Sequence, residues 1–130
     1  MPANEPSGLL ADFEAGRVDP RNFPHRSHVE VSYELLERHR FPEALLHLAS
    51  GLRSLAVKTG KPEVYHETIT AAFLALIAER RLRGQYAGWD DFAERNPDLL
   101  EKECLRSWYE PDLLRSPVAR RTFILPRAGR

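Results

Sequence analysis

The ten prolines and seven glycines of this 130-residue chain break it into segments, and most of these segments have helical periodicity. Between the breaks, apolar residues recur every three or four positions, which is the spacing of one face of an α-helix. No Asn-Gly hairpin turn and no sustained two-residue alternation, the marks of β-strands, occurs in the sequence. We therefore expect an all-α fold: a single-domain, compact bundle of about four to five main helices over residues 1–130. Its ends, at about 1–7 and 127–130, are expected to be flexible.

Capping and breaking residues set the expected helix boundaries. The expected helices are a short one between Ser7 and Gly16, then residues 25–39, 42–59, 62–83 and 97–108, with short turns at 89–92, 110–111 and 116–117. For the second helix, Ser27 followed by Glu30 has the form of a capping box, and Pro24 at the first helical position is the alternative start. Asn96 before Pro97 marks the start of the last long helix. That helix should bury Leu99, Leu100, Leu105 and Trp108.

Charge and hydropathy exclude several classes of protein. Nineteen basic residues balance nineteen acidic ones, which argues against nucleic-acid binding because phosphate-backbone binders usually carry a basic excess. No apolar run is long enough to span a bilayer, and the first residues lack the basic start and apolar stretch of a signal peptide. Cys104 is the one cysteine, so neither an internal disulfide nor a thiolate metal cluster is expected. We expect a cytoplasmic protein that binds neither nucleic acid nor a membrane.

Three of the five histidines are predicted to meet at one end of the bundle. Short connections favour antiparallel neighbours, so the helices over 25–39 and 62–83 should run parallel, with their N-termini at the same end. His25 and His28 lie at the start of the first of these helices, and His66 lies in the first turns of the second. His39 lies about 16 Å from His28 along the helix axis and is not expected to join them. His47 falls off the apolar stripe of its helix and is expected to face water.

A His-x-x-His pair with a third imidazole is a ligand set suited to a divalent transition metal, namely Zn, Fe, Ni or Cu. Glu67 or Glu30 would supply a carboxylate ligand or an acceptor for a second ring nitrogen. The alternative is that His25, His28 and His66 serve in packing or lie at the surface. The spacing alone leaves both interpretations open.

Three runs of the sequence recur together as motifs elsewhere. They are Phe-Pro-His-Arg-Ser-His-Val at 23–29, Tyr-His-Glu-Thr-Ile-Thr at 65–70, and an ending over 108–126 with Ser-Pro-Val-Ala-Arg at 116–120. In this order they resemble a family of small bacterial helical proteins usually labelled hypothetical, with aromatic-x-His-x-x-His, Tyr-His-Glu-Thr-(Ile/Leu)-Thr and Tyr-Tyr-Ser … Ser-x-x-Ala-Arg motifs. The similarity covers about residues 13–126, although this chain has Trp108-Tyr109-Glu110 where the family often has Tyr-Tyr-Ser. The resemblance implies a shared site without implying a reaction. The matching positions are His25, His28, Tyr65, His66, Glu67, Thr70, Tyr109 and Arg120.

The leading hypothesis is a metal-dependent enzyme with its ion at the three histidines, acting on a small anionic or carbonyl-bearing molecule. Glu67, Tyr109 and Arg120 are the predicted catalytic residues, with Glu67 as general base and the other two holding the substrate. Each has a structural alternative. Glu67 could be a favourable charge at a helix start, Tyr109 a buried aromatic, and Arg120 a tie between the tail and a helix C-terminus.

Two other functions stay open. One is a non-catalytic module that binds a small ligand or a heme-like cofactor through the histidines. The other is a protein-interaction domain whose basic tail docks on a partner; the basic residues of that tail are Arg115, Arg120, Arg121, Arg127 and Arg130. A homodimer is also open, because one apolar set would bury either inside one chain or between two: Leu113, Leu114, Phe123 and Ile124.

Overall fold

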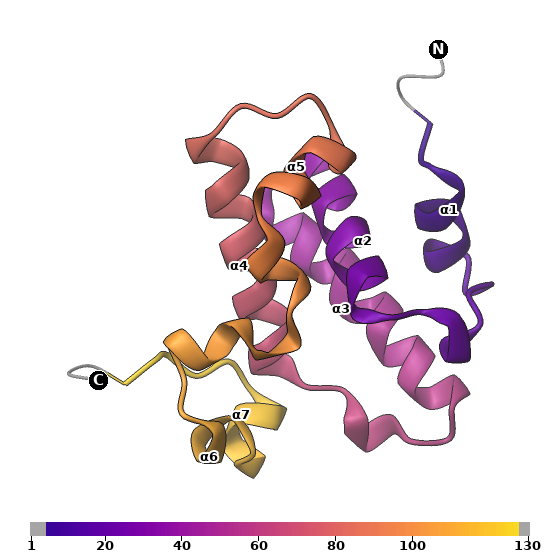
Figure 1. Ribbon diagram of the computed structural model, residues 1–130. Coiled ribbons are helices and arrows are strands. Elements are labelled where there is room, and N and C mark those ends of the chain that lie inside the picture. The colour runs from indigo at the N-terminus through magenta and orange to yellow at the C-terminus, as the bar shows by residue number, and fades with distance from the viewer. Residues whose placement is uncertain (1–4, 128–130) are drawn as a thin grey trace.

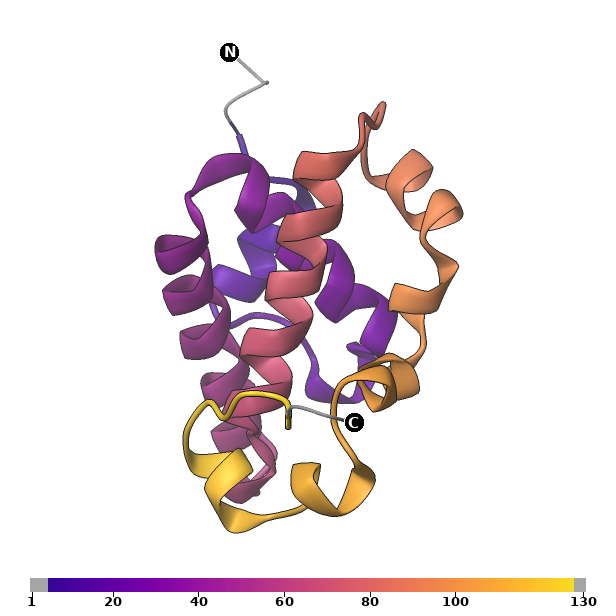
Figure 2. The ribbon, with the colours of Figure 1, turned by 90° about the vertical axis from the view of Figure 1, so that its left-hand side faces the viewer.

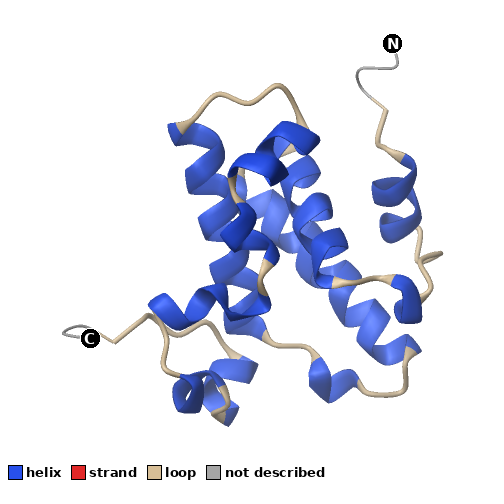
Figure 3. Cartoon of the chain, in the orientation of Figure 1, coloured by secondary structure: helices blue, strands red, loops and turns tan. Residues whose placement is uncertain are grey.

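The computed structural model describes residues 5–127, and in that stretch the chain forms helices and loops without any β-strand (Figure 3). The α-helices are α1 (Gly8–Glu14), α2 (His25–Arg38), α3 (Phe41–Lys58), α4 (Glu67–Arg83), α5 (Trp89–Arg95), α6 (Pro111–Leu114) and α7 (Pro117–Arg121). The 3₁₀-helices are η2 (Pro20–Asn22), η3 (Pro62–Val64), η4 (Pro97–Leu100) and η5 (Lys102–Ser107). The all-α, single-domain prediction is confirmed. None of the described helices is both long and apolar enough to cross a membrane.

The outermost residues of the two predicted flexible ends, 1–4 and 128–130, lie outside the described residues. Ser7, which was also assigned to a flexible end, caps α1, because its hydroxyl accepts a hydrogen bond from the backbone N–H of Leu10 at 3.1 Å. The cap that the sequence predicted for the first helix is therefore present.

Helices α2, α3 and α4 pack on one another and form the main core (Figure 1). Only His39 and Arg40 separate α2 from α3, and such a short link makes the two helices antiparallel neighbours. Leu35, Leu48, Leu74 and Ile77 of these helices are buried in this core, with 2% or less of each residue exposed. Helix α1 covers one side of this core, and Figure 1 shows it at the opposite edge of the molecule from α6 and α7.

Helix α2 begins at His25, as predicted, but neither proposed cap arrangement is present. Pro24 is the N-cap residue and not the first helical residue, and Ser27 lies inside the helix, so the capping box does not form. Helix α4 begins at Glu67 and not at Pro62, because Pro62 opens the separate turn η3 and the backbone of Tyr65 is extended. A proline signals the start of a helix but does not fix how far that helix continues.

The predicted long helix over 97–108 is also wrong. This stretch forms the two 3₁₀-helices η4 and η5, which are separated by the extended backbone of Glu101 (φ −100°, ψ 126°). Leu99 and Leu105 are buried as predicted, whereas 38% of Trp108 is exposed. The two short turns place Leu99 in the main core and Leu105 in a separate cluster with Ala72 and Phe73 of α4.

Helix α4 has a second buried side, which the C-terminal segment covers. Ala72, Phe73, Leu105 and Tyr109 form a smaller core cluster there. The sequence left open whether four apolar residues of this segment are buried inside one chain or between two. Leu113, Leu114 and Ile124 pack against this cluster within the chain, and Phe123 is 44% exposed. The yellow C-terminal segment crosses the lower part of α4 in Figure 2. The fully buried hydroxyl of Thr68 holds it in place, donating to the carbonyl oxygen of Thr122 at 2.8 Å and accepting from the N–H of Ile124 at 3.1 Å.

Thr68→Val is expected to lower the free energy of unfolding by about 2 kcal/mol, because it leaves one N–H and one C=O without their partner. Thr70→Val is the matched control in the same helix. The Thr70 hydroxyl donates to the carbonyl oxygen of His66, which also accepts the Thr70 backbone N–H, so that oxygen keeps a partner. Its loss should be under about 1 kcal/mol. Urea unfolding followed by circular dichroism measures both, and equal losses would contradict the assigned role of Thr68.

Candidate functional site

The structure brings the three predicted ligand histidines to the same end of the bundle. His25 and His28 lie in the first turn of α2, with ring centroids 6.3 Å apart, and His66 immediately precedes α4. His28 and His66 line one pocket, while His25 and His28 line a smaller cavity deeper in the core. The starts of α2 and α4 are therefore close together, as the sequence predicted.

Both ring nitrogens of His66 are used by the protein. Nδ1 accepts a hydrogen bond from the backbone N–H of Ile69 at 3.1 Å, which makes the imidazole the N-cap of α4. The proton therefore sits on Nε2, which donates it to the carbonyl oxygen of Leu114 at 2.6 Å. Burial lowers the pKa of His66, in keeping with a neutral ring. A metal ion could bind this imidazole only after the helix cap or the bond to Leu114 is broken.

His25 and His28 are also held inside the fold. Nε2 of His25 donates to the carbonyl oxygen of Leu99 at 3.0 Å, and its ring lies edge-on to Phe73 with centroids 4.8 Å apart. The ring of His28 lies 4.7 Å from that of Phe23, whose backbone carbonyl raises the pKa of the imidazole against the larger, opposite effect of burial. Burial lowers the pKa of both imidazoles, for His28 to about 4. Both rings are therefore uncharged near neutral pH.

Each of the three predicted catalytic residues has its own partner in the protein. Oε1 of Glu67 accepts a hydrogen bond from the hydroxyl of Tyr65 at 2.6 Å. Tyr109 is buried, and its hydroxyl donates to the carbonyl oxygen of Ile124 at 2.8 Å. Arg120 donates to two carbonyl oxygens of η3 at 3.0 and 3.2 Å and so ties α7 to that turn. These contacts fasten segments of the chain and do not gather the three residues around one centre.

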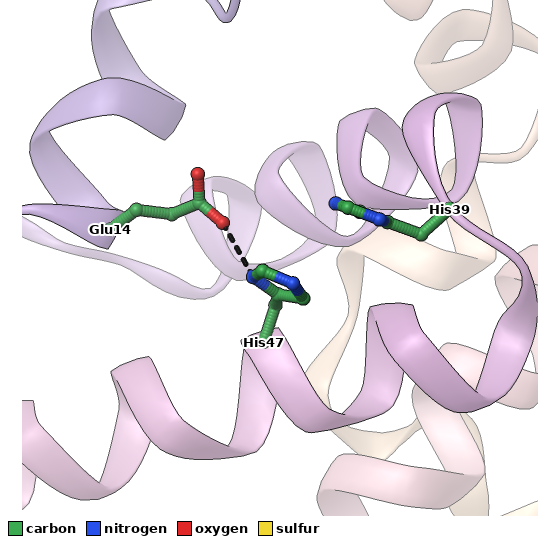
Figure 4. A group of neighbouring side chains, drawn as sticks. All are labelled: Glu14, His39 and His47. Atoms are coloured by element: carbon green, nitrogen blue, oxygen red, sulfur yellow. Dashed lines mark hydrogen bonds and ion pairs between the residues drawn. The ribbon is translucent and has the colours of Figure 1, made fainter.

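A different group of side chains can hold a metal ion. Among the described residues, Glu14, His39 and His47 have their ligand atoms all within 4.8 Å of one another (Figure 4). Nδ1 of His47 lies 2.9 Å from Oε2 of Glu14, and the ring of His39 stacks on that of His47 with centroids 4.4 Å apart. The predicted set of three histidines forms no such group within the described part of the chain. The ligand set that the structure gathers is therefore not the one that the sequence predicted.

The three side chains of this cluster come from three elements (Figure 4). Glu14 is the last residue of α1, His39 follows the last residue of α2, and His47 lies in the second turn of α3. His39 and His47 face each other because α2 and α3 are antiparallel helices joined by a two-residue link. The cluster lies at the surface, where 42% of the His47 side chain and 34% of the Glu14 side chain are exposed.

Glu14 reaches the histidines because α1 lies very close to α3. A Cβ atom at Gly51 would lie 2.2 Å from Cζ of Phe13, so only glycine leaves room for that ring. The same ring stacks on Phe23 with centroids 5.5 Å apart. At the start of α1, the backbone N–H and the hydroxyl of Ser7 donate to the Glu34 carboxylate of α2 at 2.7 and 2.5 Å. Contacts at both ends of this short helix therefore fix the position of Glu14.

A groove of about 520 Å³ lies beside the cluster, and Glu14 and His47 both line it. Ser50 and Ser54, which follow His47 by about one and two turns of α3, line the same groove. A metal ion at the cluster would have space next to it for a small molecule, with serine hydroxyls within the same wall.

Sequence reasoning missed this cluster. His39 was set aside because of its distance from His28, and His47 because it was expected to face water, which it does. One signal was available, since His39 and His47 flank the predicted short turn between two antiparallel helices. The contribution of Glu14 had no such signal, because the position of α1 depends on the packing of Phe13 against Gly51.

Comparison with protein-family models, with curated proteins and with solved structures finds no match to this chain. The family resemblance drawn from the three motifs therefore stays an expectation.

Gly51→Ala is expected to lower the free energy of unfolding by about 1–3 kcal/mol, because the added methyl group collides with the ring of Phe13. Gly8→Ala is the control, because a Cβ at Gly8 meets nothing within 4 Å. This second change should stabilise the protein by up to about 1 kcal/mol. Urea unfolding measures both. A stabilising Gly51→Ala, as helix propensity alone predicts, would contradict the close approach of α1.

Stability is expected to fall on acidification because the buried imidazole of His28 is neutral. Its pKa is lowered from 6.5 to about 4 in the folded protein, so the unfolded chain takes up a proton at a higher pH. The stabilisation is complete above pH 6.5 and is lost as the pH falls towards 4. From about pH 7 to about pH 5, His28 should account for a loss of about 2 kcal/mol. Unfolding curves at these two pH values, compared with those of His28→Leu, measure it. The loss in the variant should be smaller by this amount, with a remainder from His25 and His66, whose pKa values burial also lowers. An unchanged dependence would contradict the assignment to His28.

Proposed function

We propose that this protein binds a divalent transition-metal ion at Glu14, His39 and His47, with Zn²⁺ as the best match. The bound ion takes a small anionic or carbonyl-bearing molecule from the adjoining groove. One observation carries the proposal: two imidazoles and a carboxylate from three separate elements lie with their ligand atoms within 4.8 Å of one another.

The donor set supports a metal of this class. Two histidines and one glutamate bind zinc in several hydrolytic enzymes and leave a position open for water or substrate. The same set with two or three open positions is used by non-heme Fe(II) enzymes. Hard cations such as Ca²⁺ and Mg²⁺ prefer oxygen ligands and fit two imidazoles poorly. Zn²⁺ in an open site polarises carbonyl groups and activates water. A molecule bound in the groove would be exposed to both effects.

Binding requires a small local adjustment of the cluster. Donor atoms around one tetrahedral zinc ion lie about 3.3 Å apart, so the three side chains must draw together from their present spread of up to 4.8 Å. The planes of the His39 and His47 rings are inclined by only 18°. Because imidazole lone pairs lie in the ring plane, one ring must turn about its side-chain bonds before both point at one ion. Side chains this exposed change rotamer within nanoseconds.

The groove supports binding of a second, small ligand. Glu14 and His47 line it, so a metal ion between them faces it directly. Ser50 lies one helical turn from His47 on the same wall, where its hydroxyl would donate to an oxygen of a metal-bound anion. The groove volume of about 520 Å³ is sufficient for a small carboxylate or phosphate.

The first test is titration of the tag-free protein with Zn²⁺ by calorimetry, and with Co²⁺ followed in the visible range. We expect one ion per chain. His39→Gln, His47→Gln and Glu14→Gln should each weaken binding by at least about tenfold, since even partners of a ligand cost 10–100-fold. Addition of acetohydroxamate to the Co²⁺ protein should change its visible spectrum, because the anion enters an open coordination position.

The matched control variants are His25→Gln and His28→Gln, the same substitution at two histidines of the sequence-predicted ligand set. They should leave zinc affinity unchanged within about twofold. Gly51→Ala should weaken binding along with the Glu14 variant, because it displaces α1. If the zinc affinity falls for the His25 and His28 variants but not for the His39 and His47 variants, the site proposed here is wrong and the original ligand set is correct.

A further inference from the structure

A second cavity, lined by none of the residues of the metal groove, lies between η2, α2, α3 and the start of α4. Its volume is about 300 Å³, and its walls are mainly apolar, with Phe23, Leu52, Leu55 and Ile69 among them. A smaller hollow of about 60 Å³ continues from it toward Phe73 and Ile77 in the core. The two spaces share four lining residues, namely His28, Leu52, Ile69 and Thr70. The two spaces are therefore adjacent parts of one pocket, and the imidazole of His28 lies in the wall that they share, which we call the neck.

The hydroxyl groups that line this pocket donate their hydrogen bonds to acceptors of the protein itself. The hydroxyl of Thr59 donates to the carbonyl oxygen of Ala56 at 2.7 Å, and that of Thr70 donates to the carbonyl oxygen of His66 at 2.8 Å. The other two hydroxyls of the lining are those of Tyr65 and Ser32. Tyr65 donates to the carboxylate of Glu67 at 2.6 Å, and Ser32 donates to the carbonyl oxygen of His28 at 2.8 Å.

Three imidazoles line the pocket. Those of His25 and His66 donate their Nε2–H to the carbonyl oxygens of Leu99 and Leu114. The backbone carbonyl of Phe23 acts on the His28 ring in the direction that raises its pKa, and we assign the N–H of His28 to that carbonyl. A neutral imidazole has one donor and one acceptor nitrogen, so the second nitrogen of His28 remains an acceptor. The side chains of the pocket therefore offer acceptors to a ligand and no donor hydrogen.

The charge of the lining excludes ionised ligands. No carboxylate, ammonium or guanidinium group is among the residues that line the pocket. An anion would find no donor there, and a cation would lose its hydration shell without meeting a counter-charge. The raised pKa of Tyr65, caused first by burial and then by its bond to Glu67, keeps that phenol protonated as well.

We propose that this pocket binds a small, neutral, largely apolar molecule that carries one hydroxyl or N–H group, such as a single-ring phenol or an indole, and that the free nitrogen of His28 accepts its hydrogen bond. The ring fills the apolar outer chamber, and its donor reaches the neck. The site is independent of the proposed metal centre and operates without a metal ion.

The test uses phenol as the probe, with the protein kept in EDTA so that metal binding plays no part. Titration followed by proton–nitrogen correlation spectra should show saturable binding with a dissociation constant of about 1 mM, which suits a ligand of seven heavy atoms. The amide signals that move should be those of Leu52, Ile69 and Thr70. Anisole, which has the same ring without a donor, should bind about 3–10-fold more weakly, the value of one net hydrogen bond. Benzoate should show no saturable binding.

Variants separate the pocket from the rest of the surface. Leu55→Trp fills the outer chamber and should abolish phenol binding, whereas Leu46→Trp, on an exposed part of the same helix, should leave it unchanged. His28→Leu should bring the affinity for phenol down to that for anisole. Absence of saturable phenol binding, benzoate binding as tight as phenol, or equal effects of the two tryptophan variants would each overturn the proposal. Because no metal is present, these outcomes leave the zinc proposal unaffected.

Discussion

The burial of α4 on two sides is the constraint on which the rest of the structure depends. Its apolar residues lie against α2 and α3 on one side and against the C-terminal segment on the other. That segment is made of short turns with little internal stability, so side chains must hold it on the helix. Thr68 bonds the segment to α4 itself, and His66, the N-cap residue of that helix, bonds to α6. Tyr109 ties two parts of the segment together, and Arg120 fastens α7 to η3. The fold is thus closed by polar contacts around an apolar helix.

These contacts offer a structural explanation for several residues of the sequence motifs. A tyrosine, histidine, threonine or arginine in a recurring pattern suggests chemistry, yet each can equally bond to the main chain of a distant segment. Sequence spacing does not distinguish the two cases, because the partner carbonyl belongs to a residue of any type. In this chain the partners of Tyr109 and His66 are Ile124 and Leu114, which carry no polar side chain. The contacts that close the fold therefore give Tyr109 and His66 a structural role.

Helical periodicity and the positions of the prolines predicted the all-α class, the antiparallel α2–α3 pair and the meeting of the N-termini of α2 and α4. These features depend on local spacing and on the length of the links between helices. Three other features could not be predicted from such local signals. The stretch 97–108 has a good helix start but forms two 3₁₀ turns, because the contacts of Leu99 and Leu105 with different parts of the core outweigh local preference. The N-cap role of His66 needs a ring nitrogen that a pattern of residue types does not show. The docking of α1 depends on the missing side chain of Gly51.

Burial and hydrogen bonding divide the histidines into two groups. An imidazole binds a metal only with a free lone pair, and burial in this fold commits ring nitrogens to backbone carbonyl and N–H groups, both of them at His66. His39 and His47 lie at the surface, where the neighbours of their rings are each other and a carboxylate. Exposure leaves them free to turn toward an ion, at the cost of the preorganisation that a rigid site provides. The placement of Glu14 by the packing of Phe13 on Gly51 supplies part of that rigidity, so the proposed metal site depends on a contact that contains no ligand atom.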